Sequence, residues 1–334
     1  MRKNAKNKKS IKLAEQVAAI LTKRGEEAQK RAREIILNEK FGCETIRKAI
    51  HFSMQEWHKI KHPGFLSIAC ETVGGDSEIA NEVGASLLFL LSSAHIHDDI
   101  IDQSKSKEGK PTVYSKFGRD IALLTGDALL FEGLMLLHKI CEKLPVHKKE
   151  VILHIIKSAF FEVCCGEANE VILRHEHAFS PEKCLDNLRK RAAMAEATMR
   201  IGGIIGDGSD EEIEILGHYG RTLGILAAIR EEFIDIYDPE ELMNRYRNEL
   251  PPLPILYALK DEKKKNKINS MIQKKHISQE DASALVKLIL NSEEVRKLKK
   301  KMQSLIENEL KLLKPLKINR KTLKLILYSM MEDL

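Results

Sequence analysis

The sequence predicts an all-α protein built as one large helical bundle. Glycine and proline are few, 18 and 9 in 334 residues, whereas sandwiches, barrels and doubly wound sheets need many turns. Apolar residues recur at helical spacing along most of the chain, and no long segment alternates as a strand does. No change in composition marks a linker, so we expect a single domain over residues 1–334 with a basic N-terminal segment at about 1–10.

Turn residues and apolar patterns define the expected helices. The pattern of 42–59 ends before Pro63-Gly64, and that of 65–73 ends at Gly74-Gly75. The centre of segment 77–102 is apolar or small on every side, so we expect this helix to be buried within the bundle. Residues 103–116 form a polar loop. The complete set of expected helices is 10–38, 42–59, 65–73, 77–102, 119–141, 148–175, 180–206, 210–237, 253–260, 278–290, 293–314 and 317–332.

Composition and charge exclude several classes of protein. The formal net charge is +6, but its basic runs lack the motifs and aromatic residues of nucleic-acid readers, so we expect them to be solvated helix faces. We find no apolar stretch long enough to cross a membrane and no signal-type apolar core at the N-terminus. The six cysteines have neither disulfide-framework nor zinc spacing, which indicates a reducing compartment, and we expect the cytoplasm.

The first candidate site is an acidic cluster that closes the apolar helix 77–102. Asp98 and Asp102 are four residues apart and share a helix face, with Asp99 about 100° around it. Three neighbouring carboxylates repel one another unless a cation neutralises them, and a helix C-terminus disfavours negative charge. Oxygen ligands of this kind suit Mg²⁺, which also binds phosphate oxygens. The alternative is an acidic turn that only faces solvent.

The second candidate site repeats the same spacing 133 residues later. Glu231, Glu232 and Asp235 close another apolar helix. Alone this pattern is weak, but two such clusters could face one another across a bundle and hold two or three Mg²⁺ ions. Mg²⁺ on a diphosphate makes it a leaving group, and an apolar core beside it excludes water from a carbocation.

Four segments together carry a family resemblance. They are HDDIIDQSKSKEGKPTVYSKFG at 97–118, LTGDALL at 124–130, ACETVGGD at 69–76 and GRTLG at 220–224. In their order along the chain they resemble the trans-polyprenyl diphosphate synthases of the class I isoprenoid synthase superfamily. The resemblance implies a helical bundle around a central apolar cavity, usually a homodimer, with a Mg²⁺-dependent site. It also implies that an allylic diphosphate ionises, isopentenyl diphosphate attacks, and a proton is lost.

The resemblance implies roles for residues that match the family's motifs. The implied metal ligands are Asp98, Asp99, Asp102, Glu231 and Asp235, with Glu232 as a further candidate. Lys190 matches a lysine that grips the allylic diphosphate, although a plain surface lysine is the alternative. Arg245 falls near another diphosphate-binding lysine. Glu167 and Glu170 match polar positions beside the metals, or else lie on a solvated face.

The binding site for the second diphosphate departs from the family pattern. Ile60 and His62 stand where arginines are usual, and Glu108 stands in a further arginine position. Arginine is the preferred partner of a diphosphate, so the binding site for the second diphosphate has lost family residues. The predicted metal site retains its acidic residues. The substitute cations that we expect are Lys59, His62 and Lys107, with Lys61 or Lys105 nearby.

Three functions remain open at this point. The first is a divergent elongase that condenses an allylic diphosphate with isopentenyl diphosphate. The second is a class I terpene synthase or lyase that needs only one prenyl diphosphate. The third is a weakly active or regulatory subunit that pairs with an intact homologue, which a neighbouring gene for such a homologue would favour.

The helix before the first cluster also predicts the size of the hydrocarbon pocket. Ser93 and Ala94 lie five and four residues before Asp98, where a bulky residue stops chain growth in resembling enzymes. These small residues leave room for a C15–C20 or longer chain, with Leu90 and Leu87 as the next floor. The alternative is that small residues here only allow close helix packing.

Overall fold

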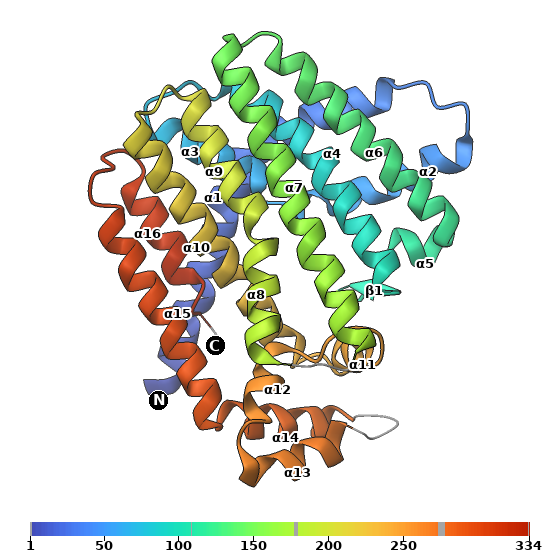
Figure 1. Ribbon diagram of the computed structural model, residues 1–334, viewed down its shortest axis with the longest axis vertical. Coiled ribbons are helices and arrows are strands. Elements are labelled where there is room, and N and C mark those ends of the chain that lie inside the picture. Colours follow the sequence, from blue (N-terminus) through green and yellow to red (C-terminus); the bar gives the residue numbers. More distant parts are fainter. Residues whose placement is uncertain (1, 108, 177–179, 273–277, 333) are drawn as a thin grey trace.

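The protein is helical throughout, as the computed structural model in Figure 1 shows, and the predicted all-α class is confirmed. The structure describes residues 2–107, 109–176, 180–272, 278–332 and 334; for 2–12, 240, 247 and 248 it describes the backbone alone. The N-terminal half contains α1 (Arg2–Asn38), α2 (Glu44–Ser53), the 3-10 helix η1 (Met54–Lys59), α3 (His62–Thr72), α4 (Ser77–Ile101), β1 (Ser106–Lys107), β2 (Lys110–Pro111), α5 (Val113–Phe117), α6 (Arg119–Cys141) and α7 (Val146–His175). The C-terminal half contains α8 (Pro181–Arg191), α9 (Ala193–Ile205), α10 (Asp210–Asp235), α11 (Pro239–Asn248), α12 (Leu253–Ala258), α13 (Glu262–Ile272), α14 (Gln279–Leu290), α15 (Glu293–Leu312) and α16 (Arg320–Ser329).

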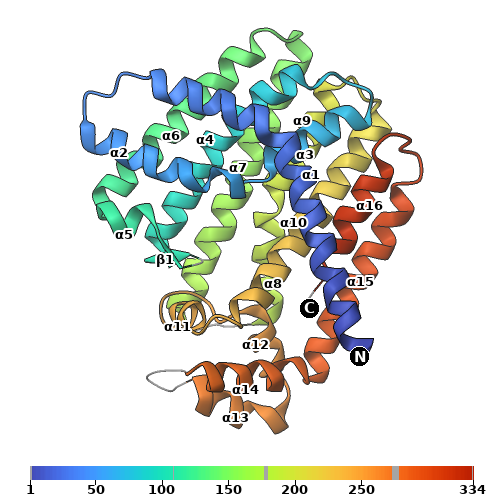
Figure 2. The ribbon, with the colours of Figure 1, turned by 180° about the vertical axis from the view of Figure 1, so that it is seen from behind.

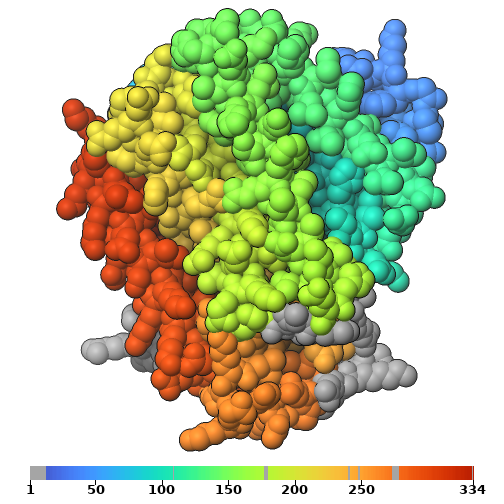
Figure 3. Space-filling view, in the orientation of Figure 1, coloured from blue at the N-terminus to red at the C-terminus, as the bar shows by residue number. Residues whose placement is uncertain are grey.

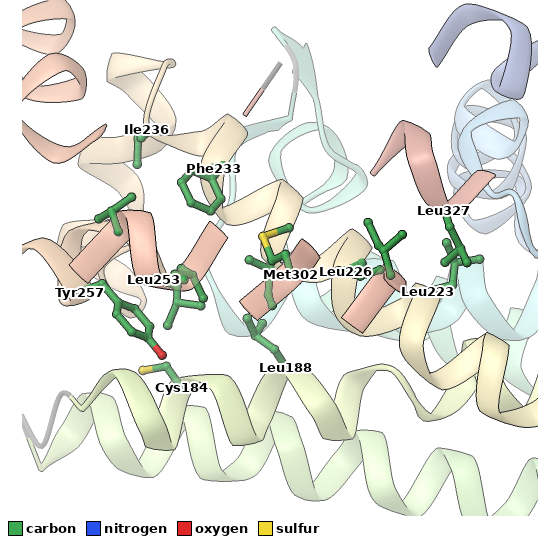
Figure 4. Close-up of a cluster of buried hydrophobic side chains, with 14 of the residues drawn as sticks. Cys184, Leu188, Leu223, Leu226, Phe233, Ile236, Leu253, Tyr257, Met302 and Leu327 are labelled. Carbon is green, nitrogen blue, oxygen red and sulfur yellow. The ribbon is translucent and has the colours of Figure 1, made fainter. Parts of the chain in front are cut away.

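Helix α4 lies at the centre of one half of the bundle. It packs against α1, α3 and α6, while α9 packs against α3, α7 and α10 (Figures 1 and 2). Leu87, Leu88, Phe89 and Leu90 of α4 are fully buried, as the all-round apolar pattern predicts. A second apolar cluster joins α8, α10, α12 and α15, with Leu188, Leu226, Leu253 and Met302 facing one another in Figure 4.

The largest differences from the expected helices fall at 180–206 and 103–116. The first is two helices, α8 and α9, that meet at Ala192. Gly224 of α10 lies so close there that a Cβ atom on it would stand 2.8 Å from the Ala192 Cβ. The helix is interrupted at the residue where α10 approaches this closely, and periodicity alone does not show the interruption. The expected loop contains the β1–β2 hairpin and α5, and Gly109 supplies its positive φ of 73°.

Two unexpected helices, α11 and α13, lie near the lower end of the molecule in Figure 1. Most residues of α13 are polar, and Ile268 and Ile272 are its buried residues. Its apolar pattern is therefore too short to distinguish this helix, in the sequence, from a solvated basic segment. The basic side chains before residue 13, which were expected on a solvated segment, lie outside the described side chains.

Two helices of the described chain, α4 and α6, are long and apolar enough to cross a membrane, whereas the sequence was expected to contain no such stretch. The criterion is length and composition only. In α4, 72% of the apolar window is buried, so the core of the bundle explains its character. In α6 only 33% is buried, and several of its large apolar residues, such as Phe131 and Met135, are exposed.

Candidate functional site

The first acidic cluster lies where α4 ends and the β1–β2 hairpin begins. Asp98 and Asp99 occupy the last turn of α4, and Asp102 caps it. The hairpin turns back so that Lys107 Nζ lies 3.1 Å from Asp98 Oδ2 and 2.7 Å from Asp99 Oδ1. Arg174 of α7 reaches within 3.8 Å of Asp102 Oδ1. Lys107, expected to bind substrate, therefore does lie at the site, but it neutralises the aspartates.

The second acidic cluster lies at the end of α10 and is partly closed by Arg245 of α11. Arg245 donates to Glu232 Oε1 at 2.8 Å and to Asp235 Oδ2 at 2.5 Å, and its Nε lies 2.9 Å from Glu249 Oε2. The backbone amide of Leu253 donates to the other Glu232 oxygen at 2.6 Å. Arg245 thus forms an ion cluster with Glu232, Asp235 and Glu249, and the diphosphate and metal roles of Arg245 and Glu232 stay predictions. Glu231 and Asp235 are four residues apart on α10, so Asp235 connects this ion cluster with the face that carries Glu231.

Charge interactions link the two clusters across the bundle. The ammonium of Lys107 helps to hold the pKa of Asp98 low, and it counteracts the raised pKa values that burial gives Asp99, Glu231 and Asp235. A single side chain acts on both sets of carboxylates, so they lie close together. In Figures 1 and 2 the hairpin after α4 lies beside α11, which follows the second cluster.

Helix α7 adds Glu167 and Glu170, and α8 adds a cation that the motif comparison missed. Arg191 Nε lies 3.0 Å from Glu167 Oε1, and its Nη1 lies 3.8 Å from Glu170 Oε2. Arg191 also interacts with Asp98 of the first cluster and Glu231 of the second. Lys190, the neighbouring residue, matches the family motif, so the motif gave no indication of Arg191. The available signal was the position of Arg191 around the axis of α8.

Two other expected substrate residues have local partners. Lys190 Nζ lies 3.4 Å from the exposed Asp186 of its own helix. Lys59 Nζ lies 2.5 Å from Glu56 Oε2, and Lys110 Nζ lies 2.9 Å from the other oxygen of the same carboxylate. Glu108, expected to oppose a second diphosphate, lies outside the described residues.

His62 lies at the start of α3, with its ring edge-on to Phe65 at 6.5 Å between centroids. Burial and the nearby His95 lower its pKa to about 4, so it is neutral at pH 7. His95 in turn interacts with Lys107, Asp98 and Arg191. A neutral His62 can donate one hydrogen bond to an anion but brings no charge.

The expected pocket wall lies along α4. Ser93 and Leu90 are buried, and Ala94 is partly exposed. A Cβ atom on Gly133 of α6 would stand 2.7 Å from Leu90 Cδ2, so Leu90 is tightly held between the two helices. This tight contact would fix Leu90 at the predicted end of the pocket. The pocket assignment itself stays a prediction.

The site holds more carboxylates than cations. The carboxylates of both clusters and of α7 face Lys107, Arg174, Arg191 and Arg245. Burial raises the pKa of Asp102 to about 7 and that of Glu249 to about 9, because neighbouring acids add to the cost of ionisation. Among the described residues, no group of three or more His, Cys, Asp or Glu side chains is gathered as metal ligands are. The donor set nevertheless fits Mg²⁺, because it supplies hard oxygen ligands with an uncompensated negative charge.

Metal-free protein is expected to lose thermal stability as the pH rises from about 6.5 to about 9. The pKa values of Asp102 and Glu167 are raised to about 7 and that of Glu249 to about 9, so the folded state holds protons that the unfolded chain has lost. Each such group costs roughly 1.4 kcal/mol per pH unit until its folded pKa is passed. His62 and His95, with pKa values near 4, act in the opposite direction only below about pH 6.5.

Differential scanning fluorimetry in EDTA, repeated with Mg²⁺, would measure this slope. Glu249→Gln removes the carboxyl group whose pKa is raised to about 9, the highest of these three carboxyl groups. The melting temperature of this variant should therefore fall less steeply between about pH 7 and pH 9. A melting temperature that is constant or rises over this range would contradict the charge imbalance.

Known proteins match this chain in family, in sequence and in fold. The Polyprenyl synthetase family model matches residues 38–289. A short chain isoprenyl diphosphate synthase from Methanothermobacter thermautotrophicus is 29% identical over 231 residues, which cover 69% of this chain and 70% of that protein. The fold matches a geranylgeranyl pyrophosphate synthetase from Pyrococcus horikoshii with a TM-score of 0.82 and 23% identity, over 96% of this chain and 99% of that one. It also matches a geranylgeranyl pyrophosphate synthase from Corynebacterium glutamicum, crystallised with isoprenyl diphosphate and magnesium, with a TM-score of 0.77 and 21% identity over 95% and 99%.

Proposed function

Because the chain belongs to the polyprenyl synthetase family, a family of transferases, we propose that it condenses an allylic prenyl diphosphate with isopentenyl diphosphate in a Mg²⁺-dependent reaction. The observation that supports this proposal is the placement of two acidic clusters, 133 residues apart in sequence, at one end of the bundle. The product that we propose is geranylgeranyl diphosphate or a longer all-trans chain, made in the cytoplasm.

The chain's own residues would supply binding and orientation. Asp98, Asp99 and Asp102 on α4 would hold Mg²⁺ from one side, and Glu231 and Asp235 on α10 from the other, with two or three ions in all. Mg²⁺ bound there would neutralise the diphosphate and allow it to leave. The buried apolar face of α4 would receive the hydrocarbon tail and keep water away from the ionised carbon.

The second diphosphate would bind on the η1 side of the site. Lys59 and Lys107 are the cations that would meet it there, and the neutral His62 would donate a hydrogen bond. Lys59 shares Glu56 with Lys110, so the incoming anion would take the place of this carboxylate. Lysine is a point charge and not a bidentate fork, so we expect a high KM for isopentenyl diphosphate.

The test is an assay with farnesyl diphosphate, labelled isopentenyl diphosphate and Mg²⁺, with EDTA as the control. Incorporation of label into a longer prenyl chain supports the proposal. Release of diphosphate from the allylic substrate alone would indicate a terpene synthase or lyase instead. Turnover of neither, with activity gained on mixing with an intact homologue, would indicate a regulatory subunit.

Replacing Ala94 by Phe is expected to shorten the longest product by about one isoprene unit or more. The phenyl ring would fill the space one turn before Asp98, where the growing tail would pass. Chain length is read by chromatography of the dephosphorylated products. Ala94→Ser, which keeps a small side chain, should leave the products unchanged, and an unaltered distribution in Ala94→Phe would exclude this pocket.

We further propose that the protein is a homodimer joined through α6 and α7. Phe131 of α6 is 68% exposed and Phe161 of α7 is 62% exposed, and Leu124, Leu134 and Met135 share the outward side of α6. Figure 3 shows α7 across the front of the molecule with α6 to its right. Large apolar side chains gathered on one face indicate a surface that a partner covers, and a second copy offers the same apolar face.

Changing Phe131 to Glu is expected to weaken self-association by about a hundredfold, because two charges would be buried across the two-fold axis. Light scattering after size-exclusion chromatography, over a dilution series, measures the dimer fraction. Leu312→Glu on α15, a 43% exposed position on another helix, is the matched control and should not change it. An unchanged dimer in Phe131→Glu would place the interface elsewhere.

A further inference from the structure

We propose that the basic end of the molecule docks on the surface of an anionic lipid bilayer. The basic end consists of residues 260–272 and 278–301, which include α13, α14 and the first half of α15. The inference goes beyond the proposed function. It follows from the distribution of charge along the chain, from the packing of this end and from the side chains that are exposed there.

Positive charge is concentrated in the basic end. Its 37 residues contain eleven Lys or Arg and six Asp or Glu, a net charge of +5, whereas the whole chain has a net charge of +6. The other residues, nearly nine tenths of the chain, are therefore close to neutral in sum. A protein with its excess positive charge at one end turns that end toward an anionic surface.

The packing of the helices brings the two ends of this basic sequence together. Lys260 and Lys301 are 41 residues apart, yet their Nζ atoms lie 5.5 Å and 5.9 Å from the centroid of the same Tyr257 ring. Lys264 Nζ donates to the carbonyl of Asn291, between α14 and α15, at 2.6 Å. In Figure 3 the orange part of the chain forms the lower surface of the molecule. The cations of α13 and α15 therefore belong to one end of the fold.

Several of these cations are available to an external anion. Four lysines of the basic end pair with acids, namely Lys260 with Glu182, Lys264 with Asp261, Lys265 with Glu262 and Lys297 with Glu294. Six further cations are exposed and pair with no carboxylate of the described residues: Lys263, Lys267, Lys287, Arg296, Lys300 and Lys301. Because α13 buries Ile268 and Ile272, Lys263 and Lys267 extend from its outer side. Exposed lysines gathered on an amphipathic helix are a usual feature of proteins that bind anionic lipids.

Exposed apolar and aromatic side chains lie at the same end of the molecule. Ile234 and Tyr237, at the end of α10, and Tyr246 of α11 are all exposed. In Figures 1 and 2, α11 lies at the lower end together with α13 and α14. Tyrosine has an apolar ring and a polar hydroxyl, which suits the boundary between lipid and water.

A bilayer fits these features better than a nucleic acid does. The aromatic ring among the lysines, Tyr257, is only 4% exposed, so it cannot stack on a base. The choice of a bilayer also rests on the proposed function, because a product with a long hydrocarbon chain leaves water for a lipid phase. Both acidic clusters lie toward the same end, so docking there would place the site near the bilayer.

The test is sedimentation of the full chain with lipid vesicles, without substrate or Mg²⁺. We expect binding to vesicles with about one-third phosphatidylserine and little binding to phosphatidylcholine alone, with release as salt is raised to about 0.5 M. A triple variant should weaken binding to the anionic vesicles by about tenfold to a hundredfold, because each lysine near an anionic surface contributes separately. Its changes are Lys263→Gln, Lys267→Gln and Lys300→Gln.

A second triple variant is the matched control, since it removes the same charge from exposed positions on α1 and α2 and should change binding by less than about threefold. Its changes are Lys23→Gln, Lys30→Gln and Lys48→Gln. Equal losses in both variants would overturn the inference, as would equal binding to neutral and anionic vesicles. Tighter binding to a single-stranded RNA than to the anionic vesicles would overturn it in favour of a nucleic-acid partner.

The salt dependence of the unaltered protein keeps the inference testable if the first variant fails to fold. Binding to anionic vesicles that persists at about 0.5 M salt would contradict docking through exposed lysines. Vesicle binding is measured without turnover, so its absence in an active protein rejects this inference alone. Binding by a protein without prenyltransferase activity would reject the proposed function and leave the docking surface supported.

Discussion

Asp98→Asn is expected to lower kcat/KM for prenyl transfer by about 10²–10³-fold, a loss typical of one electrostatic contact to a transition state. The physical reason is that Asp98 is fully ionised at neutral pH. Lys107 and Arg191 hold its pKa down at about 2 in spite of burial. Asparagine keeps the shape of the side chain and removes the negative charge that would attract Mg²⁺.

Steady-state kinetics over a range of Mg²⁺ concentrations would measure this loss. Part of it should be recovered at high Mg²⁺, because the remaining carboxylates still favour the ion. Asp207→Asn is the matched control, since Asp207 is exposed and has a positive φ that asparagine also accepts. Equal kinetics for Asp98→Asn and the unaltered protein would show that the first cluster does not hold the metal.

Arg245→Met is expected to cost about 3–5 kcal/mol in the free energy of unfolding, the usual loss when one partner of a buried ion cluster is removed. Glu232 and Glu249 would then be buried without a cation, and Arg245 would no longer donate to the Leu250 carbonyl. The ends of α10 and α11 would lose the contact that joins them. Urea unfolding followed by circular dichroism measures the change.

Arg47→Met removes a comparable arginine–glutamate pair at a half-exposed position and serves as the control. Its unfolding free energy should change by less than about 1 kcal/mol. If Arg245→Met is no more harmful than Arg47→Met, the cluster around Arg245 is not the structural element that its burial indicates.

The chemistry of the site was easier to predict from sequence than its charge pairing. The apolar pattern of α4 and the spacing of Asp98, Asp99 and Asp102 depend on local periodicity, which one helix is enough to reveal. The partners of these acids come from a hairpin, from α7 and from α11. No periodicity connects Lys107 or Arg245 with the carboxylates they meet, because tertiary packing decides those contacts.

Interruptions of helices and short elements were likewise hard to predict from the sequence. The pattern of apolar residues runs through Ala192 without interruption, because α8 and α9 both bury one face. At this position Gly224 of another helix approaches closely, which the apolar pattern does not show. Arg191 stands directly before the break, and its contacts likewise do not follow from the pattern of one helix.

The β1–β2 hairpin connects the first acidic cluster with η1. Lys107 and Lys110 are directly paired across it, and one contacts the first acidic cluster while the other contacts Glu56 on η1. A single inserted or deleted residue in this turn would shift both lysines together. The position of the ammonium group beside the first acidic cluster and the contact with Glu56 are therefore mechanically coupled through one short turn.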